Sequence, residues 1–502
     1  MIGGRKMKTK VAIIGAGISG ASIARVLSRY ENLEVHLIEK APDVGWGVSK
    51  ANTALIHGGY DDEPEKYPTR AKLCIRGNRL WHQWVKELQI AHVWNGALIV
   101  ATKEEDFDEL ERLLERGRRN GVPEMRIVDR EELFHLEPNL TKEAIGALWV
   151  PIVGQIAPIP AVIALVENAV ANGVKTHLET EVGGIKVENG EVKGVETNSG
   201  FIEADVVINA AGLYADKIAR MAGIDYFEIH PRKGEYWLFD EGIPGPRRVL
   251  FPTPTPISKG IVVTTEVSGH LMIGPNAQDL PPEEKEDFAT TREGLEGVWE
   301  GAKKLWPQLP PRNKVIRTFA GLRPEPTGGD FIIKAEEEVQ GFINVAGIRS
   351  PGLTSAPAIA YEVAGIIERD LGIKLVEKEK WNPYRKEITH FFMLRPEQVN
   401  GMVKKDPAYG KIVCRCNNVS EGDILEAIER MKFIGVKTPS VDSVKFRTKA
   451  TTGTCQGSFC RPRIVQLLAR EYGIEPWKVT LKGRGSEIGI GDVKAILRRD
   501  EA

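Results

Sequence analysis

The sequence predicts an α/β protein with a nucleotide-binding βαβ unit at its N-terminus, strand-rich middle segments and a small helical region at its C-terminus. Three observations support this prediction. Residues 10–39 read as strand, glycine-rich turn, helix and second strand. Runs typical of strands alternate with turn signals through residues 174–274. Four of the five cysteines lie at residues 414–460, among predicted helices at 420–431 and 462–472.

Size and composition limit the classes of protein that this chain can represent. With 502 residues, 42 % of them hydrophobic, two or three domains with substantial cores are expected. The formal net charge is −1 and no long basic stripe is present, which disfavours nucleic-acid binding. No apolar run reaches the length of about 18 residues that a membrane span needs. Because unpaired thiols persist in reducing compartments, we expect a cytoplasmic protein, with peripheral docking at the cytoplasmic face of the membrane left open.

The N-terminal segment carries a dinucleotide-binding loop. Its three glycines permit a tight turn, close approach of the backbone to a pyrophosphate, and packing of the helix on the strand. The second strand ends in an acidic residue, whose carboxylate can accept hydrogen bonds from ribose hydroxyls. We favour a cofactor site over a plain βαβ turn. Its candidate residues are Gly15, Ala16, Gly17, Ser19, Gly20, Glu39 and Lys40.

Four cysteines near the C-terminus form a candidate metal site: Cys414, Cys416, Cys455 and Cys460. Four thiolates suit an iron–sulfur cluster or a zinc ion, because both are soft centres. Zinc knuckles usually space ligands as Cys-x-x-Cys, whereas this chain has Cys-x-Cys and Cys-x4-Cys. An iron–sulfur cluster would also give electrons from the nucleotide cofactor somewhere to go, and we favour it over zinc. The isolated Cys74 is expected to be a buried core thiol.

Four separated segments resemble the glycine-oxidase and D-amino-acid-oxidase superfamily of FAD enzymes, over roughly residues 8–372. They are the glycine loop, residues 45–60, Asn209-Ala-Ala-Gly212 and the loop at 347–354. The C-terminal quarter resembles the bacterioferritin-associated-ferredoxin type of [2Fe-2S] domain. The combination is similar to the catalytic subunits of anaerobic-type, FAD-dependent glycerol-3-phosphate dehydrogenases.

The resemblance implies a Rossmann-type FAD-binding domain interleaved with an antiparallel-sheet α+β substrate domain, followed by a small helical [2Fe-2S] domain. The FAD-binding domain would comprise residues 8–82, 155–222 and 315–375, and the substrate domain residues 83–154 and 223–314. A linker at 376–410, the [2Fe-2S] domain at 411–475 and a C-terminal tail at 476–502 would complete the chain.

The resemblance also implies which residues hold FAD. Residues 47–55 would follow the pyrophosphate toward the flavin ring, and Val182 would meet the adenine. Gly352, Leu353 and Thr354 precede a helix, so their N–H groups can stabilise negative charge on the reduced flavin. The alternative is a plain helix-start turn. The remaining candidates in these segments are Gly47, Val48, Ser49, Asn52, Ala54, Leu55, Ala210, Ala211, Gly212, Gly321, Gly347 and Ser350.

Oxidation of an alcohol by hydride transfer needs a base for the hydroxyl proton and a clamp for the anionic end of the substrate. Arg323, in Gly-Leu-Arg-Pro, matches an arginine that faces the substrate in this superfamily; a salt bridge is the alternative. His57 is the candidate base, with a structural role as the alternative. Tyr236 is a catalytic candidate that would orient the substrate. Lys50 and Arg349 are candidate phosphate contacts or plain surface charges.

The expected reaction is oxidation of sn-glycerol 3-phosphate to dihydroxyacetone phosphate. Electrons would leave through FAD and the [2Fe-2S] cluster to a dye, a quinone or a partner subunit, either quinone-linked or similar to pyridine-nucleotide–disulfide oxidoreductases. Residues 57–60 and 70–78 also resemble L-2-hydroxyglutarate dehydrogenases, and a secondary-amine (proline or sarcosine) dehydrogenase is a further alternative.

Two considerations limit this expectation. The membrane-bound glycerol-3-phosphate enzymes carry Gly-Gly-Lys where this chain has Gly347-Ile-Arg-Ser, so their phosphate contacts do not transfer whole. A non-catalytic flavin and iron–sulfur relay subunit is the remaining alternative. The presence of Arg323 and of the large region between residues 80 and 320 argues against it, because a relay needs no substrate domain.

Overall fold

The computed structural model describes residues 8–254, 260–489 and 491, and the chain forms two compact units. The first unit consists of residues 1–38, 45–175 and 181–385. The second consists of residues 386–502 with the short segments 39–44 and 176–180. Most of the segments expected to bind FAD and substrate lie in the first unit, but Glu39, Lys40 and residues 176–180 belong to the second, and the interleaved boundaries stay a prediction. The expected tail at 476–502 lies partly outside the described residues.

A six-stranded sheet forms the nucleotide-binding half of the first unit, in the order β20-β21-β13-β1-β2-β9. β1 (Thr9–Ile14) pairs in parallel with β13 (Val206–Asn209) on one side and β2 (Leu33–Ile38) on the other. Helices cover both faces of such a sheet, which explains why β1 reads as a continuous apolar run. The other strands are β21 (Phe342–Ala346), the antiparallel edge strand β20 (Ile332–Ala335) and β9 (Lys175–His177).

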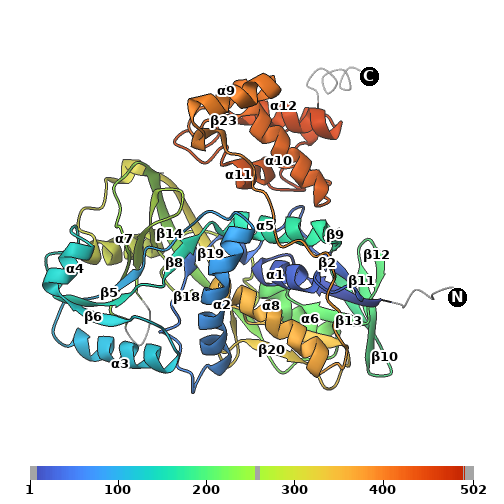
Figure 1. Cartoon of the computed structure of the whole chain (residues 1–502), viewed down its shortest axis with the longest axis horizontal. Helices are drawn as coiled ribbons and strands as arrows, with labels where there is room; N and C mark the ends of the chain where they lie inside the picture. The colour runs from blue at the N-terminus through green and yellow to red at the C-terminus, as the bar shows by residue number, and fades with distance from the viewer. Residues whose placement is uncertain (1–7, 255–259, 490, 492–502) are drawn as a thin grey trace. The chain divides into compact units, whose positions relative to one another are not determined.

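Helices from distant parts of the sequence pack against one another in this half. α1 (Ile18–Leu27) packs against α5 (Pro158–Ala171) and α8 (Gly352–Arg369), and α8 also packs against α2 (Pro68–Glu87). Figure 1 shows α1, α2 and α8 side by side next to the sheet. In α2, Gly77 makes the close approach possible, because a Cβ there would lie 2.1 Å from the carbonyl oxygen of Thr354. The hairpin strands β10 (Val182–Glu188), β11 (Glu191–Thr197) and β12 (Gly200–Glu203) and the helix α6 (Ala215–Met221) complete this half.

A nine-stranded mixed sheet forms the substrate half of the first unit. Its two longest strands, β14 (Ile229–Glu241) and β19 (Val315–Pro326), pair antiparallel along almost their whole length. β15 (Val249–Pro252) pairs in parallel with β5 (Ala97–Ala101). The predicted α/β class is confirmed, but the expected antiparallel substrate sheet is a mixed one. β5 and β15 are far apart in the sequence and are not joined by a hairpin, which would have required antiparallel pairing.

The remaining elements of the substrate half surround this sheet. In Figure 1, β5, β6, α3 and α4 lie at one end of the first unit, and the β10–β12 hairpin lies at the other. A small sheet of β3 (Leu55–Ile56), β8 (Gly154–Ile156) and β4 (His92–Val93) joins the two halves. The other bounds are β6 (Arg126–Asp129), β7 (Gly146–Val150), β16 (Val262–Thr265), β17 (His270–Gly274), β18 (Gln278–Asp279), α3 (Asp106–Arg119), α4 (Arg130–Leu136) and α7 (Arg292–Leu305).

The second unit is small and mainly helical, as the sequence predicts. Its α10 (Glu421–Phe433) begins with a capping box, in which Ser420 and Asp423 satisfy each other's backbone N–H groups. Two short strands, β22 (Ile412–Cys414) and β23 (Val419–Ser420), precede it. The other helices are α9 (Pro396–Lys405), α11 (Val441–Thr448) and α12 (Arg461–Tyr472).

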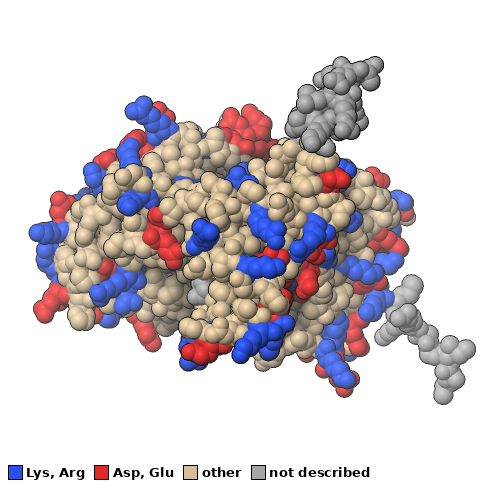
Figure 2. All heavy atoms as spheres, turned by 90° about the horizontal axis from the view of Figure 1, so that it is seen from above, with Lys and Arg blue, Asp and Glu red and all other residues tan. Residues whose placement is uncertain are grey.

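Surface charges of both signs are mixed over the face shown in Figure 2. Along the described part of the chain, no helix combines the length and the apolar character that crossing a bilayer requires.

Candidate flavin, substrate and cluster sites

The glycine loop makes a tight turn between β1 and α1. Gly15 has a φ of +103°, and a Cβ there would lie 2.5 Å from the carbonyl oxygen of Ala210. A Cβ on Gly20 would lie 1.9 Å from the carbonyl oxygen of Gly15. α1 starts at Ile18 with no side-chain cap and no acidic residue in its first turn. The positive end of its dipole is therefore available to an anion such as a pyrophosphate.

Residues 47–55 wrap against this loop through polar contacts. The Ser49 hydroxyl accepts the N–H of Ile18 at 2.9 Å. The Asn52 side chain donates to the carbonyl oxygen of Ser49 at 2.9 Å and accepts the N–H of Ala54 at 2.8 Å. These bonds hold Ala54 at a φ of +62°, a strained value for a residue with a side chain. Val48 and Leu55 belong to the same segment, with Leu55 buried in β3.

Backbone near the loop stays open where a cofactor would approach. Among the described residues, no atom lies within 4 Å of a Cβ built on Gly47 or on Gly212, which follows β13. Ala210 and Ala211 precede Gly212, and the contact between Gly15 and Ala210 brings the end of β13 to the glycine loop. Gly321 lies on the other side, where its Cβ would be 2.1 Å from the carbonyl oxygen of Ala51. The helix end and this small-residue cradle fit FAD.

The residues expected at the adenosine end take three different positions. Glu39 directly follows β2, and its carboxylate accepts the N–H of Ala41 at 2.9 Å. Lys40 is exposed. The Val182 side chain is buried in a core cluster that includes Ile38.

The loop at residues 347–351 places the start of α8 next to Leu55 and His57. Gly347 has a φ of +66°, with its Cβ position 2.4 Å from Pro326. The Thr354 hydroxyl accepts the N–H of His57 at 2.8 Å and donates to the carbonyl oxygen of Leu55 at 3.3 Å. α8 begins at Gly352 without a side-chain cap; the Gly352 N–H donates to the carbonyl oxygen of Arg349 at 2.6 Å, and the positive end of the helix dipole favours negative charge in front of it.

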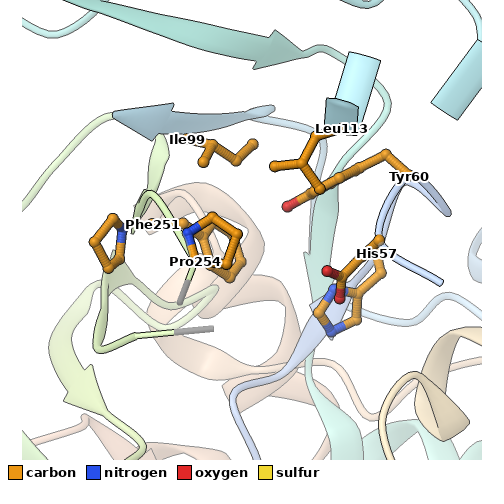
Figure 3. Close-up of a pocket in the computed structure, with 8 residues that line it drawn as sticks. His57, Tyr60, Ile99, Leu113, Phe251 and Pro254 are labelled. Carbon is orange, nitrogen blue, oxygen red and sulfur yellow. The ribbon is translucent and has the colours of Figure 1, made fainter. Parts of the chain in front are cut away.

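His57 lines a small, open pocket in the first unit. Asn78 donates to the carbonyl oxygen of His57 at 3.0 Å, so with Thr354 the backbone is held from two sides. The ring Nε2 lies 3.4 Å from the Ser350 hydroxyl. In Figure 3, His57 and Tyr60 extend from one side of the pocket and Phe251 and Pro254 from the other. The remaining lining residues are Asp61, Ile99, Leu113 and Pro252.

Arg323 is held by backbone carbonyl groups. Its Nε donates to Arg232 at 3.2 Å, and its Nη2 donates to Lys233 at 3.1 Å and to Asn276 at 2.8 Å. Burial lowers the pKa of Arg323, although a guanidinium stays charged at any ordinary pH. No carboxylate of the described residues pairs with it, so the salt-bridge alternative is wrong. The carbonyls orient two edges of the guanidinium and leave Nη1 for another ligand.

Tyr236, another candidate side chain, is buried near Arg323. Tyr236 stacks on Phe319 with ring centroids 4.6 Å apart, and its hydroxyl lies 3.3 Å from that of Thr53. Burial raises the pKa of Tyr236, so its phenol keeps its proton and can donate a hydrogen bond.

The two candidate phosphate contacts behave differently. The Arg349 side chain is only 14 % exposed and pairs with Glu325, so its interpretation as a plain surface charge is wrong. Its positive charge contributes to the lowered pKa of Arg323, which shows that the two guanidinium groups act on each other. Lys50 is exposed, with its ammonium 5.4 Å from the Trp46 ring centroid.

A buried polar network that sequence reasoning missed supports Arg323. The N–H of Glu235 donates to Asn276 Oδ1 at 2.7 Å, and Asn276 Nδ2 donates to the Glu235 carboxylate at 2.7 Å. The same carboxylate accepts the hydroxyl of Thr291, the N-cap of α7, at 3.1 Å. Glu235 is fully buried. The network fixes the carbonyl group of Asn276 that receives Arg323. In the sequence Glu235 is an isolated acidic residue beside Tyr236, and no local pattern indicates its hydrogen-bond partners.

In the second unit, the four predicted ligand cysteines form two pairs. The thiols of Cys414 and Cys460 hydrogen-bond to each other, as do those of Cys416 and Cys455. Hydrogen bonds from Cys460 and from backbone N–H groups lower the pKa of Cys414, and backbone N–H groups lower that of Cys455. The backbone donors belong to Cys416, Asn417 and Thr451 for Cys414, and to Phe459 and Gly457 for Cys455.

This arrangement fits a two-iron cluster, in which each iron takes two cysteine sulfurs and N–H groups stabilise the negative sulfur atoms. Within the described ranges, no three His, Cys, Asp or Glu side chains are grouped for a single metal ion. The loops are shaped for the cysteines: Gly453 would place a Cβ 2.4 Å from that of Cys416. Asn418, Lys449, Thr451 and Gln456 all have a positive φ. Cys74, in contrast, is a buried core thiol as predicted.

The sequence matches a known family over most of its length. Residues 10–366 match the family described as FAD dependent oxidoreductase, and residues 412–470 match the BFD-like [2Fe-2S] binding domain. The chain belongs to the FAD dependent oxidoreductase family. The expected cofactors of this FAD dependent oxidoreductase, FAD and a [2Fe-2S] cluster, are thereby confirmed.

This FAD dependent oxidoreductase is similar in sequence or structure to three proteins of known name. It is 43 % identical, over 97 % of its length and 99 % of the relative, to glycerol 3-phosphate dehydrogenase of Caloramator mitchellensis. It is 26 % identical, over 93 % of its length and 84 % of the relative, to anaerobic glycerol-3-phosphate dehydrogenase subunit A1 of Haloferax volcanii. The FAD-bound structure of L-alpha-glycerophosphate oxidase from Mycoplasma pneumoniae aligns with a TM-score of 0.70 at 32 % identity, covering 75 % of this chain and 98 % of that one.

Proposed function

We propose that this chain is an FAD-dependent glycerol-3-phosphate dehydrogenase that oxidises sn-glycerol 3-phosphate to dihydroxyacetone phosphate. The observation that carries the proposal is the partly buried, carbonyl-held guanidinium of Arg323, in a chain that resembles a named glycerol 3-phosphate dehydrogenase over almost its full length. A phosphate group carries about two negative charges at neutral pH, so its site needs desolvated cations at a fixed position.

The substrate is held at its anionic end by arginine. Arg323 offers Nη1 to a phosphate oxygen while its other donors stay on backbone carbonyls. Arg349, which keeps Glu325 as its partner, adds a second positive charge. Tyr236 donates its phenolic hydrogen bond from a fixed, stacked ring. Together these groups orient the substrate and lose little freedom on binding, because they are already ordered.

The hydroxyl proton of the substrate passes to His57. Its backbone is fixed by Thr354 and Asn78, and Nε2 lies beside the Ser350 hydroxyl at 3.4 Å. Histidine is the side chain that most often serves as a general base. FAD, when bound, supplies the two-electron acceptor for the hydride. The positive end of the α8 dipole, in the first turn at Gly352, Leu353 and Thr354, favours negative charge in front of the helix.

Electrons leave through the cysteine unit to a partner. One full-length relative is named as a subunit, which supports a partner subunit here, either quinone-linked or similar to pyridine-nucleotide–disulfide oxidoreductases. The four unbridged cysteines support a reducing, cytoplasmic location.

Anaerobic titration of the purified protein tests the substrate. We expect sn-glycerol 3-phosphate to bleach the flavin absorption and then the iron–sulfur absorption, whereas L-2-hydroxyglutarate, proline and sarcosine leave both unchanged. Bleaching by one of the other compounds alone would replace the proposed substrate with that compound. Bleaching by none of them, with a cluster that still accepts electrons from dithionite, would favour the non-catalytic relay.

Replacing Asn276 by alanine tests the support of Arg323. The change removes both side-chain bonds to Glu235, so the carbonyl group that orients Arg323 loses its anchor. We expect KM for glycerol 3-phosphate to rise roughly 10-fold with a smaller change in kcat, because the loss of one orienting bond weakens binding by about 1–1.5 kcal/mol. Gln278→Ala, at an exposed position two residues further on, is the matched control. Equal KM values for the two variants would show that the network does not position the clamp.

A further inference from the structure

All the charged side chains in the two cysteine-bearing loops are positive. The loops are residues 411–418 and 449–463, and neither contains an Asp or Glu. The chain as a whole has a formal net charge of −1, so this excess of cations is local. The five cations are Lys411, Arg415, Lys449, Arg461 and Arg463.

An exposed aromatic ring lies among these cations, next to the cluster ligands. Phe459 is 53 % exposed and directly precedes Cys460. The guanidinium of Arg415 lies 4.5 Å from the centroid of its ring. Arg415 itself separates Cys414 from Cys416, and Cys416 is exposed. The edge of the four-cysteine centre therefore reaches the surface beside an ordered aromatic and arginine pair.

The buried carboxylate of Glu421 opposes part of the positive charge of the two loops. Glu421 pairs with Arg463 at 2.8 Å and with Lys411 at 3.8 Å, but it is only 3 % exposed and lies beneath them. A two-iron cluster with four thiolates carries a charge of about −2 in its oxidised form. The five cations of the two loops outnumber this cluster charge and the carboxylate of Glu421 together.

We propose that this cluster face, defined as Lys411, Arg415, Lys449, Phe459, Arg461 and Arg463, is the docking surface for an acidic electron-accepting protein. The inference rests on the electron exit described under the proposed function. Each encounter oxidises the four-cysteine centre by one electron and reduces a one-electron acceptor in the partner, such as a haem iron. Two encounters remove the two electrons taken from one alcohol, and its two protons pass to water.

Protein is the occupant that the chemistry favours over an anionic lipid surface. An exposed aromatic and arginine pair beside positive charges is typical of protein interfaces, where these residues contribute most of the binding energy. Anionic lipid headgroups would neutralise the positive charge, but they are not redox-active and accept no electron themselves. Opposite charges also steer the encounter, raising association rates by about 10–10³-fold at low salt.

Stopped-flow oxidation of the complete, cofactor-loaded chain tests the proposal with two haem probes. The protein is first reduced with glycerol 3-phosphate and then mixed with the acidic haem domain of cytochrome b5 or with basic cytochrome c. We expect the acidic probe to react faster at low salt and to slow about 10-fold or more as ionic strength rises. The basic probe should show the opposite salt dependence. Similar rates and similar salt dependence for both would overturn the proposal.

Charge reversals assign the effect to this face. Lys449→Glu and Arg415→Glu should each slow the acidic probe about 10-fold, while the cluster absorption and the dye-linked activity stay at wild-type values. Lys437→Glu, an exposed reversal in the connection between α10 and α11, is the control and should leave the rate unchanged. Equal slowing by the control would contradict the proposal. So would sedimentation with phosphatidylserine vesicles that the same reversals abolish.

Failure of the proposed function gives a different result. If glycerol 3-phosphate does not bleach the flavin, the substrate assignment fails at that step. Reduction of the cluster with one equivalent of dithionite then allows the same probe comparison, which still tests the docking face alone.

Discussion

Replacing Arg323 by methionine is expected to lower kcat/KM for glycerol 3-phosphate by about 10³-fold, or roughly 4 kcal/mol of lost transition-state stabilisation. Methionine keeps the length of the side chain but removes the charge that Arg232, Lys233 and Asn276 hold in place. A buried phosphate left without its cation is costly. Lysine should recover only part of the loss, because one ammonium cannot bond three carbonyls and a phosphate oxygen in the same geometry.

The same strand provides a control for this prediction. Arg317 also lies in β19 but is exposed, so Arg317→Met changes the same charge at a distance from the site. We expect it to leave kcat/KM unchanged. Flavin absorption and thermal unfolding of all three variants show whether the fold and the cofactor are retained. A loss of less than 10-fold for Arg323→Met in a folded, flavin-loaded protein would remove Arg323 from the substrate clamp.

Replacing Cys416 by serine is expected to abolish the [2Fe-2S] centre and all electron transfer to protein acceptors. A serine hydroxyl is a poor ligand for a soft iron–sulfur centre, and Cys416 is one half of a thiol pair. The flavin site lies in the other unit, so reduction of the flavin by substrate should persist. Iron and sulfide analysis, electron paramagnetic resonance and anaerobic flavin bleaching measure the two halves of this prediction separately.

Cys74→Ala provides the comparison for a thiol outside the cluster. It removes a buried thiol from α2 and should cost about 1–2 kcal/mol of stability while leaving the iron content unchanged. A Cys416→Ser protein that keeps a full complement of iron would refute the four-cysteine ligand set. Zinc in the wild-type protein purified without oxygen would refute the choice of cluster.

The elements with simple apolar patterns were predicted well, and those with buried polar residues were not. β1 and its glycine turn follow from an apolar run and three glycines. α2 (Pro68–Glu87), in contrast, contains Arg70 and Asn78, which are 3 % and 1 % exposed. These polar residues interrupt the apolar periodicity on which a sequence-based helix prediction depends.

The site was predictable where a residue belongs to a local motif, and unpredictable where its role depends on distant partners. Arg323 and the four cysteines are candidates from short motifs, and their roles stay predictions. The burial of Arg349 depends on Glu325, and the role of Asn276 depends on Glu235 and Thr291. These contacts form only when separate segments fold together, so no local pattern encodes them.

The position of β1 at the centre of its sheet has a consequence for biosynthesis. β2 follows soon after β1, but the partner on the other side, β13, ends at residue 209, and β21 follows only at residue 342. The emerging N-terminal segment therefore leaves the ribosome with one edge of its central strand unpaired for much of translation. Flavin binding is thus expected only after β13 has been made, and until then the open edge of β1 can pair with another chain.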